Sequence, residues 1–197
     1  HSGIFMNGQV VLYQGERVYS SEIPTETVER FHQMVKEDGY GLTAYNDKKF
    51  YLVESSVGAR DAYGFIHSNP PALNADFYKE NPINMMLFIS LPPAEEKYKV
   101  AFPNLDFLRN TPYSVDVISK GNSKAEGIKR FLEHLNQEDA ETYAFGDGPN
   151  DIEMLQAVTH PVAMGNALPV LKEIAEFITT NNTDNGIVNG LKHYGLI

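Results

Sequence analysis

The stretch Tyr143-Ala-Phe-Gly-Asp-Gly-Pro-Asn-Asp-Ile-Glu-Met-Leu155 decides the fold of this 197-residue chain. A short apolar run ends at Gly146, an aspartate follows at once, and a glycine and a proline then turn the chain into a predicted helix. The apolar face of that helix would comprise Ile152, Met154 or Leu155, and Val158. Asp147 is therefore predicted to lie at the C-terminal tip of a strand, which is the edge where open α/β sheets bind ligands.

Two polar residues after this turn are candidate helix caps. Asn150 or Asp151 would cap the helix, and Glu153 lies near the third helical position if Asn150 is the cap. A single Gly-Asp-Gly is more often an ordinary turn than a binding site. A functional interpretation therefore needs a second feature.

The second feature is the segment Lys120-Gly-Asn-Ser-Lys-Ala-Glu-Gly-Ile-Lys129, in which Ser123 and Glu126 have the spacing of a capping box. This spacing puts Lys124 at the first helical position, where the positive end of the helix dipole disfavours a cation. The mismatch disappears if an anion binds there, because backbone N–H groups and the ammonium would share it. A solvated lysine is the alternative interpretation.

Composition restricts the class of protein. The formal net charge of −10 would repel a nucleic acid, whereas one lysine beside a bound metal can still hold a small phosphorylated substrate. The chain has no cysteine, so disulfides and thiolate metal sites are excluded and a cytoplasmic location fits best. The longest apolar runs, such as Met85 to Ile89, are too short to cross a bilayer, and no membrane partner is expected.

The order of predicted elements changes near residue 120. Residues 1–23 are predicted to form a hairpin that turns at Gly15, and a helix is predicted from Thr25 to a stop at Gly39. Strand candidates at 50–53, 85–90 and 115–118 alternate with helical pieces and give residues 24–118 an α+β character. From residue 119 to 197 helices and strands alternate, as expected of a doubly wound parallel sheet.

Four motifs in this order resemble the C-terminal half of Cof-like phosphatases of the haloacid dehalogenase (HAD) superfamily. They are Ser123-Lys-Ala-Glu-Gly-Ile128, Gly146-Asp-Gly-Pro-Asn-Asp-Ile-Glu-Met-Leu155, Val162-Ala-Met-Gly-Asn-Ala167 and Thr179-Thr-Asn-Asn-Thr-Asp-Asn-Gly-Ile187. The resemblance is strong over residues 119–196 and weaker at the Asn7-Gly8 hairpin. It implies an α/β protein with a HAD-like doubly wound parallel-sheet core in residues 119–197, a core-associated hairpin in 1–23, and an inserted α+β cap domain in 24–118 that sets substrate specificity.

The resemblance also implies roles for individual residues. Lys124 and Asp151 would be catalytic: Lys124 holds the phosphoryl group, and Asp151 is a second carboxylate beside the metal. Asp147 would be a Mg²⁺ ligand, and Asn150 would contact the phosphate or the lysine. Asn166 and the segment Asp184-Asn185-Gly186 are interpreted as turn and capping elements. The expected activity is Mg²⁺-dependent hydrolysis of a small phosphorylated metabolite through an aspartyl-phosphate intermediate.

The chain departs from the family pattern at the nucleophile. The family's attacking aspartate lies in an Asp-x-Asp-Gly pattern after an apolar strand, and this chain contains no such pattern. Asp38-Gly39 follows a predicted helix and Asn46-Asp47-Lys48 has no second acid, so neither replaces it. We hypothesise that the nucleophile lies in a remaining N-terminal segment of the same protein, and that the 197 residues alone are inactive.

Other interpretations stay open. A non-catalytic phosphate- or Mg²⁺-binding or interaction protein could have kept the fold, and the P-type ion pumps share a Gly-Asp-Gly-x-Asn-Asp motif, although they require membrane spans. Polar and aromatic residues that could line the cap are Glu54, Arg60, Tyr63 and His67, with solvated loop positions as the alternative. Sugar phosphates, nucleotides, flavin mononucleotide and pyridoxal phosphate are all compatible with this family branch.

Overall fold

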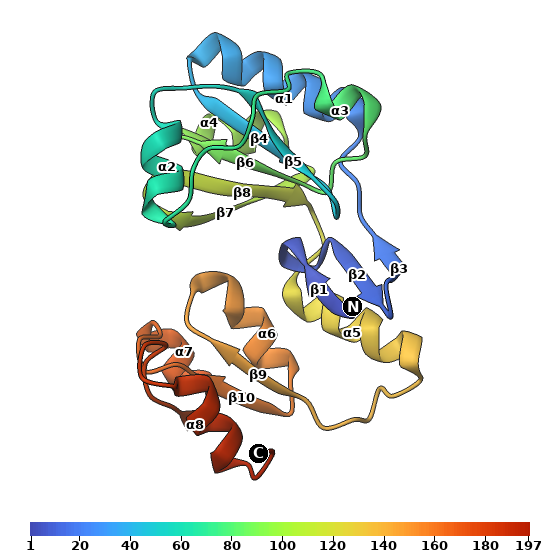
Figure 1. Cartoon of the computed structure of the whole chain (residues 1–197), viewed down its shortest axis with the longest axis vertical. Helices are drawn as coiled ribbons and strands as arrows, with labels where there is room; N and C mark the ends of the chain where they lie inside the picture. The colour runs from blue at the N-terminus through green and yellow to red at the C-terminus, as the bar shows by residue number, and fades with distance from the viewer. The chain divides into compact units, whose positions relative to one another are not determined.

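The computed structural model describes residues 1–197, which form two compact units, 1–122 and 123–197 (Figure 1). The first unit contains both the N-terminal hairpin and the segment expected to be α+β. The second contains the alternating helices and strands. None of the helices is both long and apolar enough to cross a bilayer.

The hairpin of the first unit is part of a small antiparallel sheet of three strands. These strands are β1 (Gly3–Phe5), β2 (Val10–Tyr13) and β3 (Glu16–Ser20), with a short 3-10 turn at Met6–Gly8. The turn between β2 and β3 uses Gln14 and Gly15, whose φ angles are +52° and +87°. The predicted turn at Gly15 is confirmed. Glycine suits this position because it adopts a positive φ without steric cost.

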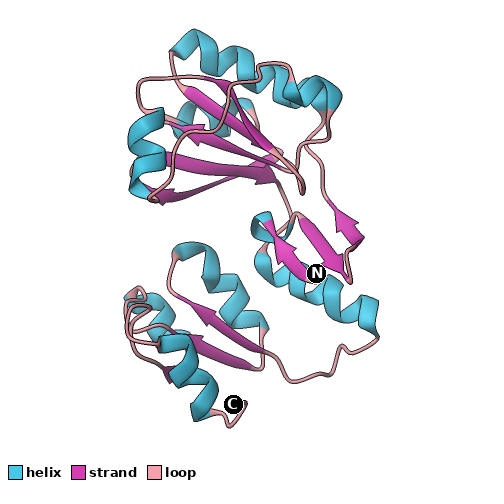
Figure 2. Cartoon of the chain, viewed as in Figure 1, coloured by secondary structure: helices cyan, strands magenta, loops and turns pink.

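A five-stranded antiparallel sheet forms the centre of the first unit, with the strand order β5-β4-β6-β8-β7 (Figure 2). Its strands are β4 (Gly41–Tyr45), β5 (Phe50–Glu54), β6 (Met85–Ile89), β7 (Leu105–Thr111) and β8 (Ser114–Ser119). The helices of this unit are α1 (Thr25–Asp38), α2 (Ala59–Phe65), α3 (Phe77–Glu80) and α4 (Glu95–Ala101). The predicted helix from Thr25 to a stop at Gly39 is confirmed, since Gly39 ends α1 with a left-handed backbone.

Aromatic side chains build the core between α1, α4 and one face of this sheet. Phe31 of α1 is fully buried, and its ring meets that of Phe88 edge to face, with centroids 5.6 Å apart. The ring centroids of Tyr98, in α4, and Phe88 are 4.4 Å apart. Truncation of a buried phenylalanine such as Phe31 to alanine costs about 3–5 kcal/mol, so this cluster contributes much of the unit's stability.

The second unit contains the parallel sheet predicted for this part of the chain. Its strands are β9 (Tyr143–Gly146), β10 (His160–Ala163) and β11 (Phe177–Ile178), in the order β11-β10-β9. Its helices are α5 (Lys124–Leu135), α6 (Ile152–Ala157), α7 (Pro169–Ile174) and α8 (Gly186–His193). β9 pairs with β10 on one side, and no other strand of this chain pairs with its second edge.

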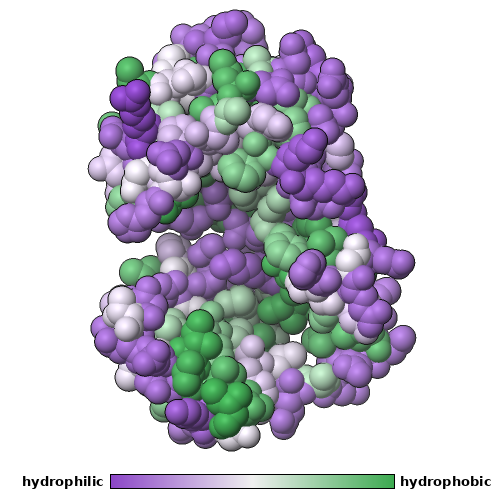
Figure 3. Space-filling model, viewed as in Figure 1, coloured by the Kyte–Doolittle hydropathy of each residue, from purple (hydrophilic) through white to green (hydrophobic).

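The predicted apolar face of α6 is confirmed. Leu155 is 1% exposed, and Ile152, Met154 and Val158 are partly buried against the same cluster. In contrast, α8 leaves apolar side chains uncovered: Ile187 is 54% exposed, and apolar surface is visible over this helix in Figure 3. The buried cluster of the second unit also contains fewer residues than that of the first.

Candidate functional site

Lys124 begins α5 as the capping pattern predicts. The Ser123 hydroxyl accepts a hydrogen bond from the Glu126 amide at 3.3 Å, which makes Ser123 the N-cap and Lys124 the first helical residue. The ammonium of Lys124 donates to Oδ1 of Asp151 at 2.5 Å. The Lys124 side chain is 31% exposed and that of Asp151 is 8% exposed, so the ion pair is buried on the carboxylate side and open to solvent on the ammonium side.

The second oxygen of Asp151 fixes the turn that follows β9. Its Oδ2 accepts hydrogen bonds from the backbone N–H groups of Asp147 at 2.9 Å and Gly148 at 3.1 Å. Asp151, not Asn150, is the residue immediately before α6, and its carboxylate is directed back to the turn rather than to the amides of the helix. The prediction that its side chain caps the helix is therefore wrong, because no side chain caps α6 and the Asp151 carboxylate anchors the preceding turn instead.

The surroundings of Asp151 keep it ionised. Burial by itself would raise the pKa of this carboxyl, but the Lys124 ammonium and the two backbone amides hydrogen-bond the charged form. Together they hold the pKa of Asp151 below its usual range. Asp151 is therefore a carboxylate at neutral pH.

A glycine at the end of β9 makes this arrangement possible. A Cβ atom on Gly146 would lie 2.7 Å from the Cβ of Asp151, closer than two such atoms can approach. Any other residue at position 146 would push Asp151 away from the turn. The first glycine of the Gly-Asp-Gly motif is thus required by packing against Asp151.

Asp147 lies directly after the last residue of β9, at the tip of the strand, as predicted. Its side chain is exposed, and its Oδ2 accepts a hydrogen bond from the Asn166 amide at 2.8 Å. Oδ1 of Asn166 in turn accepts from the backbone N–H of Asn182 at 3.0 Å. Asn166 follows β10 and Asn182 follows β11, so the loops after all three parallel strands are joined at one edge of the sheet.

The structure therefore gives Asn166 more than the turn role expected for it, because it positions the candidate metal ligand. A signal for this was present in the sequence, since Asn166 follows an apolar strand much as Asp147 does. The turn interpretation of the segment Asp184-Asn185-Gly186 is confirmed, because Asn185 has a φ of +57° and immediately precedes α8.

The oxygen ligands in this cluster fit a magnesium ion only in part. Mg²⁺ in proteins is commonly bound by one or two carboxylates, with waters and substrate phosphate completing six oxygens. Asp147 and Asp151 supply two carboxylates, and no group of three or more histidine, aspartate or glutamate side chains in the chain is arranged to hold a metal ion. Asn150 lies on the 3-10 turn Pro149–Asp151 beside them.

The four candidate cap residues differ in burial and in hydrogen-bond partners. The buried Tyr63 bonds Thr43 Oγ1 at 2.8 Å and the Tyr45 hydroxyl at 2.9 Å. Glu54 pairs with another side chain, with its Oε2 3.1 Å from Nε2 of His32. The remaining two, Arg60 and His67, are exposed. Tyr63 and Glu54 thus have structural partners of their own.

Comparisons with known proteins give a consistent result. Residues 2–191 match the family model described as haloacid dehalogenase-like hydrolase. YkrA of Bacillus subtilis (strain 168), which is provisionally named a phosphatase, is 35% identical over 198 residues, spanning 100% of this chain and 77% of YkrA.

Solved structures agree with the sequence match. The crystal structure of a hypothetical protein from Geobacillus kaustophilus HTA426 has a TM-score of 0.89 and 32% identity, covering 100% of this chain and 77% of that one. The HAD subclass IIB sugar phosphatase BT4131 has a TM-score of 0.84 and 27% identity, covering 98% of this chain and 75% of that one.

Proposed function

Because the chain belongs to the haloacid dehalogenase-like hydrolase family, we propose that it is a Mg²⁺-dependent phosphatase acting on a small phosphorylated metabolite. One observation carries the proposal: Lys124, Asp151 and Asp147 are joined by hydrogen bonds at the carboxyl end of β9. Lys124 supplies a cation held by the Asp151 carboxylate, and Asp147 supplies an exposed carboxylate beside them. Phosphoryl transfer needs such groups, because positioning and charge neutralisation supply most of its catalysis.

In this proposal Lys124 binds the phosphoryl oxygens of the substrate. Its ammonium has three donors, of which one is engaged by Asp151, and its side chain is partly open to solvent. Asp151 holds the ammonium in place by a hydrogen bond, and its bonds to the turn fix the backbone at Asp147. Bound Mg²⁺ would be held by Asp147, with Asp151 as a second carboxylate beside it, and would neutralise charge on the phosphoryl oxygens. Asn150 would contact the phosphate or the lysine.

The proposed reaction has two displacements at phosphorus. A carboxylate oxygen attacks the phosphorus, the phosphorus–oxygen ester bond breaks, and the alcohol leaves with a proton. Water then attacks the acyl phosphate, which releases inorganic phosphate and restores the carboxylate. We propose that this carboxylate comes from an N-terminal segment outside residues 1–197. The free edge of β9 supports this, since a parallel strand placed there would end at the same sheet edge as Asp147.

The other parts of the chain have proposed roles that follow from this assignment. Residues 24–118 would act as the cap that selects the substrate, and residues 1–23 would accompany the core. A cytoplasmic location fits a chain without cysteine.

Hydrolysis of p-nitrophenyl phosphate by a protein that includes the N-terminal segment tests the proposal. We expect turnover that requires Mg²⁺, and Lys124→Met should lower kcat/KM by about 100- to 1,000-fold, as expected for loss of a charge-stabilising donor. Lys120→Met is the matched control, because Lys120 lies four residues earlier in the chain, outside α5, and its ammonium bonds only the Pro103 carbonyl, at 3.4 Å.

Three outcomes distinguish the interpretations. Absence of metal-dependent turnover in the longer protein would favour a non-catalytic phosphate- or Mg²⁺-binding protein. Turnover by residues 1–197 alone would show that the nucleophile lies within them and would reject the proposed segment. Equal losses in both lysine variants would reject the role of Lys124.

A further inference from the structure

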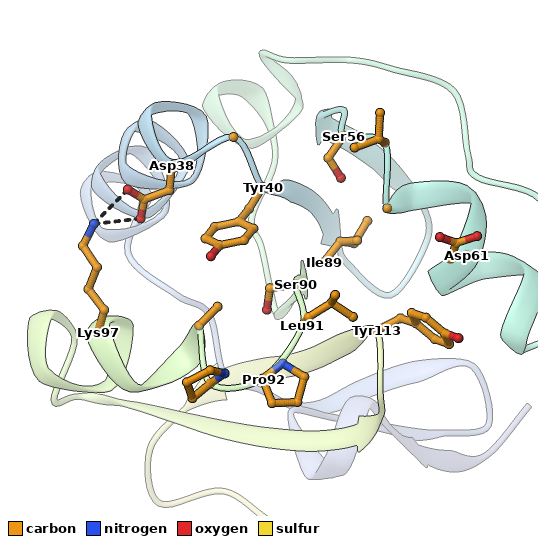
Figure 4. A pocket seen from close by; sticks show the side chains of 15 residues that line it. Asp38, Tyr40, Ser56, Asp61, Ile89, Ser90, Leu91, Pro92, Lys97 and Tyr113 are labelled. Atoms are coloured by element: carbon orange, nitrogen blue, oxygen red, sulfur yellow. Dashed lines mark hydrogen bonds and ion pairs between the residues drawn. The ribbon is translucent and has the colours of Figure 1, made fainter.

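A cavity lies in the first unit and shares no residue with the cluster of Lys124, Asp147 and Asp151. It has a volume of about 860 Å³ and is situated where β6 ends and where α2 and α4 begin (Figure 4). Cavities that bind small molecules have volumes of about 300–1,000 Å³. This one is therefore large enough for a ligand with a ring system.

The walls of the cavity are mainly apolar and aromatic. Tyr40 lies on one side and Tyr113 on the other, with Leu91 and Pro92 between them (Figure 4). Leu91 is 61% exposed, and Val57 at the rim is 99% exposed. Exposed apolar side chains gathered around a cavity are typical of a binding site, because an apolar ligand would remove them from water.

The charged groups of the cavity leave an excess of negative charge. Asp38 is neutralised by Lys97, whose ammonium lies 2.8 Å from each of its oxygens, and it also accepts from the Tyr98 hydroxyl at 2.9 Å. Asp61, near the start of α2, is exposed and forms no ion pair. Two carboxylates and one ammonium therefore line the cavity, which favours a positively charged ligand over an anionic one.

Ser56 adds a polar group that lacks a partner. Its Oγ is shielded from solvent and has no hydrogen bond. The oxygen packs against Gly41, where a Cβ atom would lie only 2.6 Å away. Ser56 is also one of the residues that line the cavity. A ligand with a hydrogen-bonding group would then supply the partner that Ser56 lacks.

From these observations we propose that this cavity binds a small aromatic amine, with the ring between Tyr40 and Tyr113 and the ammonium near Asp61. The apolar walls recognise the ring, Asp61 recognises the charge, and Ser56 bonds a polar group of the ligand. The site is separate from Lys124 and Asp151 in both residues and ligand chemistry. It does not depend on the proposed phosphatase function.

Three indole compounds that differ in charge test the proposal. Tryptamine is a cation, tryptophol is neutral and indole-3-propionate is an anion at pH 7. Because the chain has no tryptophan, indole fluorescence excited at about 295 nm reports on the added compound alone, and its change on titration with the 197-residue protein gives the affinity. We expect saturable binding of tryptamine, weaker binding of tryptophol, and the weakest binding of indole-3-propionate.

Two substitutions locate the site. Ser56→Ala should weaken tryptamine binding about threefold to tenfold, the factor that one hydrogen bond supplies, without lowering the melting temperature, because the hydroxyl has no partner in the free protein. Asp61→Asn should weaken tryptamine about twofold to fivefold and leave tryptophol unchanged, as expected for one exposed charge. Matched controls are Ser55→Ala and Glu80→Gln, both at exposed positions that do not line the cavity.

The proposal is overturned by any of three results. These are no saturable binding of tryptamine, binding of indole-3-propionate as tight as that of tryptamine, or equal affinities in the Ser56→Ala, Asp61→Asn and control variants. Loss of binding in a variant counts only if its far-ultraviolet circular dichroism and melting temperature match those of the parent. If a variant fails this criterion, amide chemical-shift changes of the parent protein on addition of tryptamine decide, and changes away from Tyr40, Ser56 and Asp61 reject the site.

Discussion

Replacement of Asp151 by asparagine is a sharp test of how the cluster at β9 is held. In the structure the Asp151 carboxylate accepts from the Lys124 ammonium and from two backbone amides, and it is only 8% exposed. Asparagine has nearly the same shape but only one acceptor oxygen. Its NH₂ group would face either the ammonium or the turn, and both are donors. One side of the anchor is therefore lost whichever way the amide is oriented.

The size of the effect follows from these contacts. A hydrogen bond to a charged group contributes about 1.5–3 kcal/mol when it is buried. The Lys124 side chain is 31% exposed, so water can hydrogen-bond its ammonium once the carboxylate is gone. The contribution of the ion pair to the free energy of unfolding is therefore closer to the roughly 0–1 kcal/mol of an exposed pair. The backbone bonds weaken without vanishing, because the amide oxygen can still accept. We expect a net loss of about 2 kcal/mol in the free energy of unfolding.

Urea unfolding of a double-mutant cycle measures this loss. The cycle comprises the parent, Asp151→Asn, Lys124→Met and the double variant, followed by circular dichroism at 222 nm. Both single variants should be destabilised, and the double variant should be less destabilised than their sum by about 1 kcal/mol, since the two residues share one interaction. Additive losses, or a loss below about 0.5 kcal/mol for Asp151→Asn, would refute the idea that this pair anchors the turn.

Two further substitutions follow from the structure. Gly146→Ala should destabilise the protein by about 1–3 kcal/mol, because the new methyl group would overlap Asp151 at 2.7 Å, whereas the control Gly64→Ala has open space around it and should be neutral or stabilising; thermal melts compare the two. Glu95→Gln should cost about 2 kcal/mol at pH 7, because Glu95 is 7% exposed and holds Arg109 by two hydrogen bonds of 2.6 Å. The hydrogen bonds from Arg109 hold the pKa of Glu95 below its ordinary 4.5, so this stabilisation is present above pH 4.5 and is lost as the pH falls through the lowered value. Urea unfolding followed by tyrosine fluorescence should therefore show the two proteins converging in stability as the pH falls below 4.5, and a difference that is constant with pH would contradict this account.

Local patterns made much of the fold predictable. The α1 helix, the cap at Ser123 and the strand–turn–helix around Asp147 each depend on residues within a few positions of one another, and such patterns are legible in a single sequence. β4 was missed because four of its five residues are buried and it lacks the alternation of a half-exposed strand. β7 was missed because it carries Asp106 and Arg109 among its apolar residues.

The candidate site was predictable in its members but not in its connections. Lys124 and Asp151 could be singled out as residues, but their ion pair joins positions 27 apart. The bond between Asn166 and Asp147 spans 19 positions and depends on two parallel strands ending side by side. Whether Asp151 would cap α6 or turn back to β9 depends on the space left by Gly146, and this space exists only in the folded chain.

The hydrogen bond between Asn166 and the Asn182 amide has a practical use. That amide proton is two hydrogen bonds away from the Asp147 carboxylate, through a single side chain. A cation captured by Asp147 would draw electron density from the Asn166 amide and alter the magnetic environment of the Asn182 proton. In a ¹⁵N-labelled sample, the resonance of one asparagine in a distant loop would thus serve as a spectroscopic gauge of metal occupancy, without any label at the ion itself.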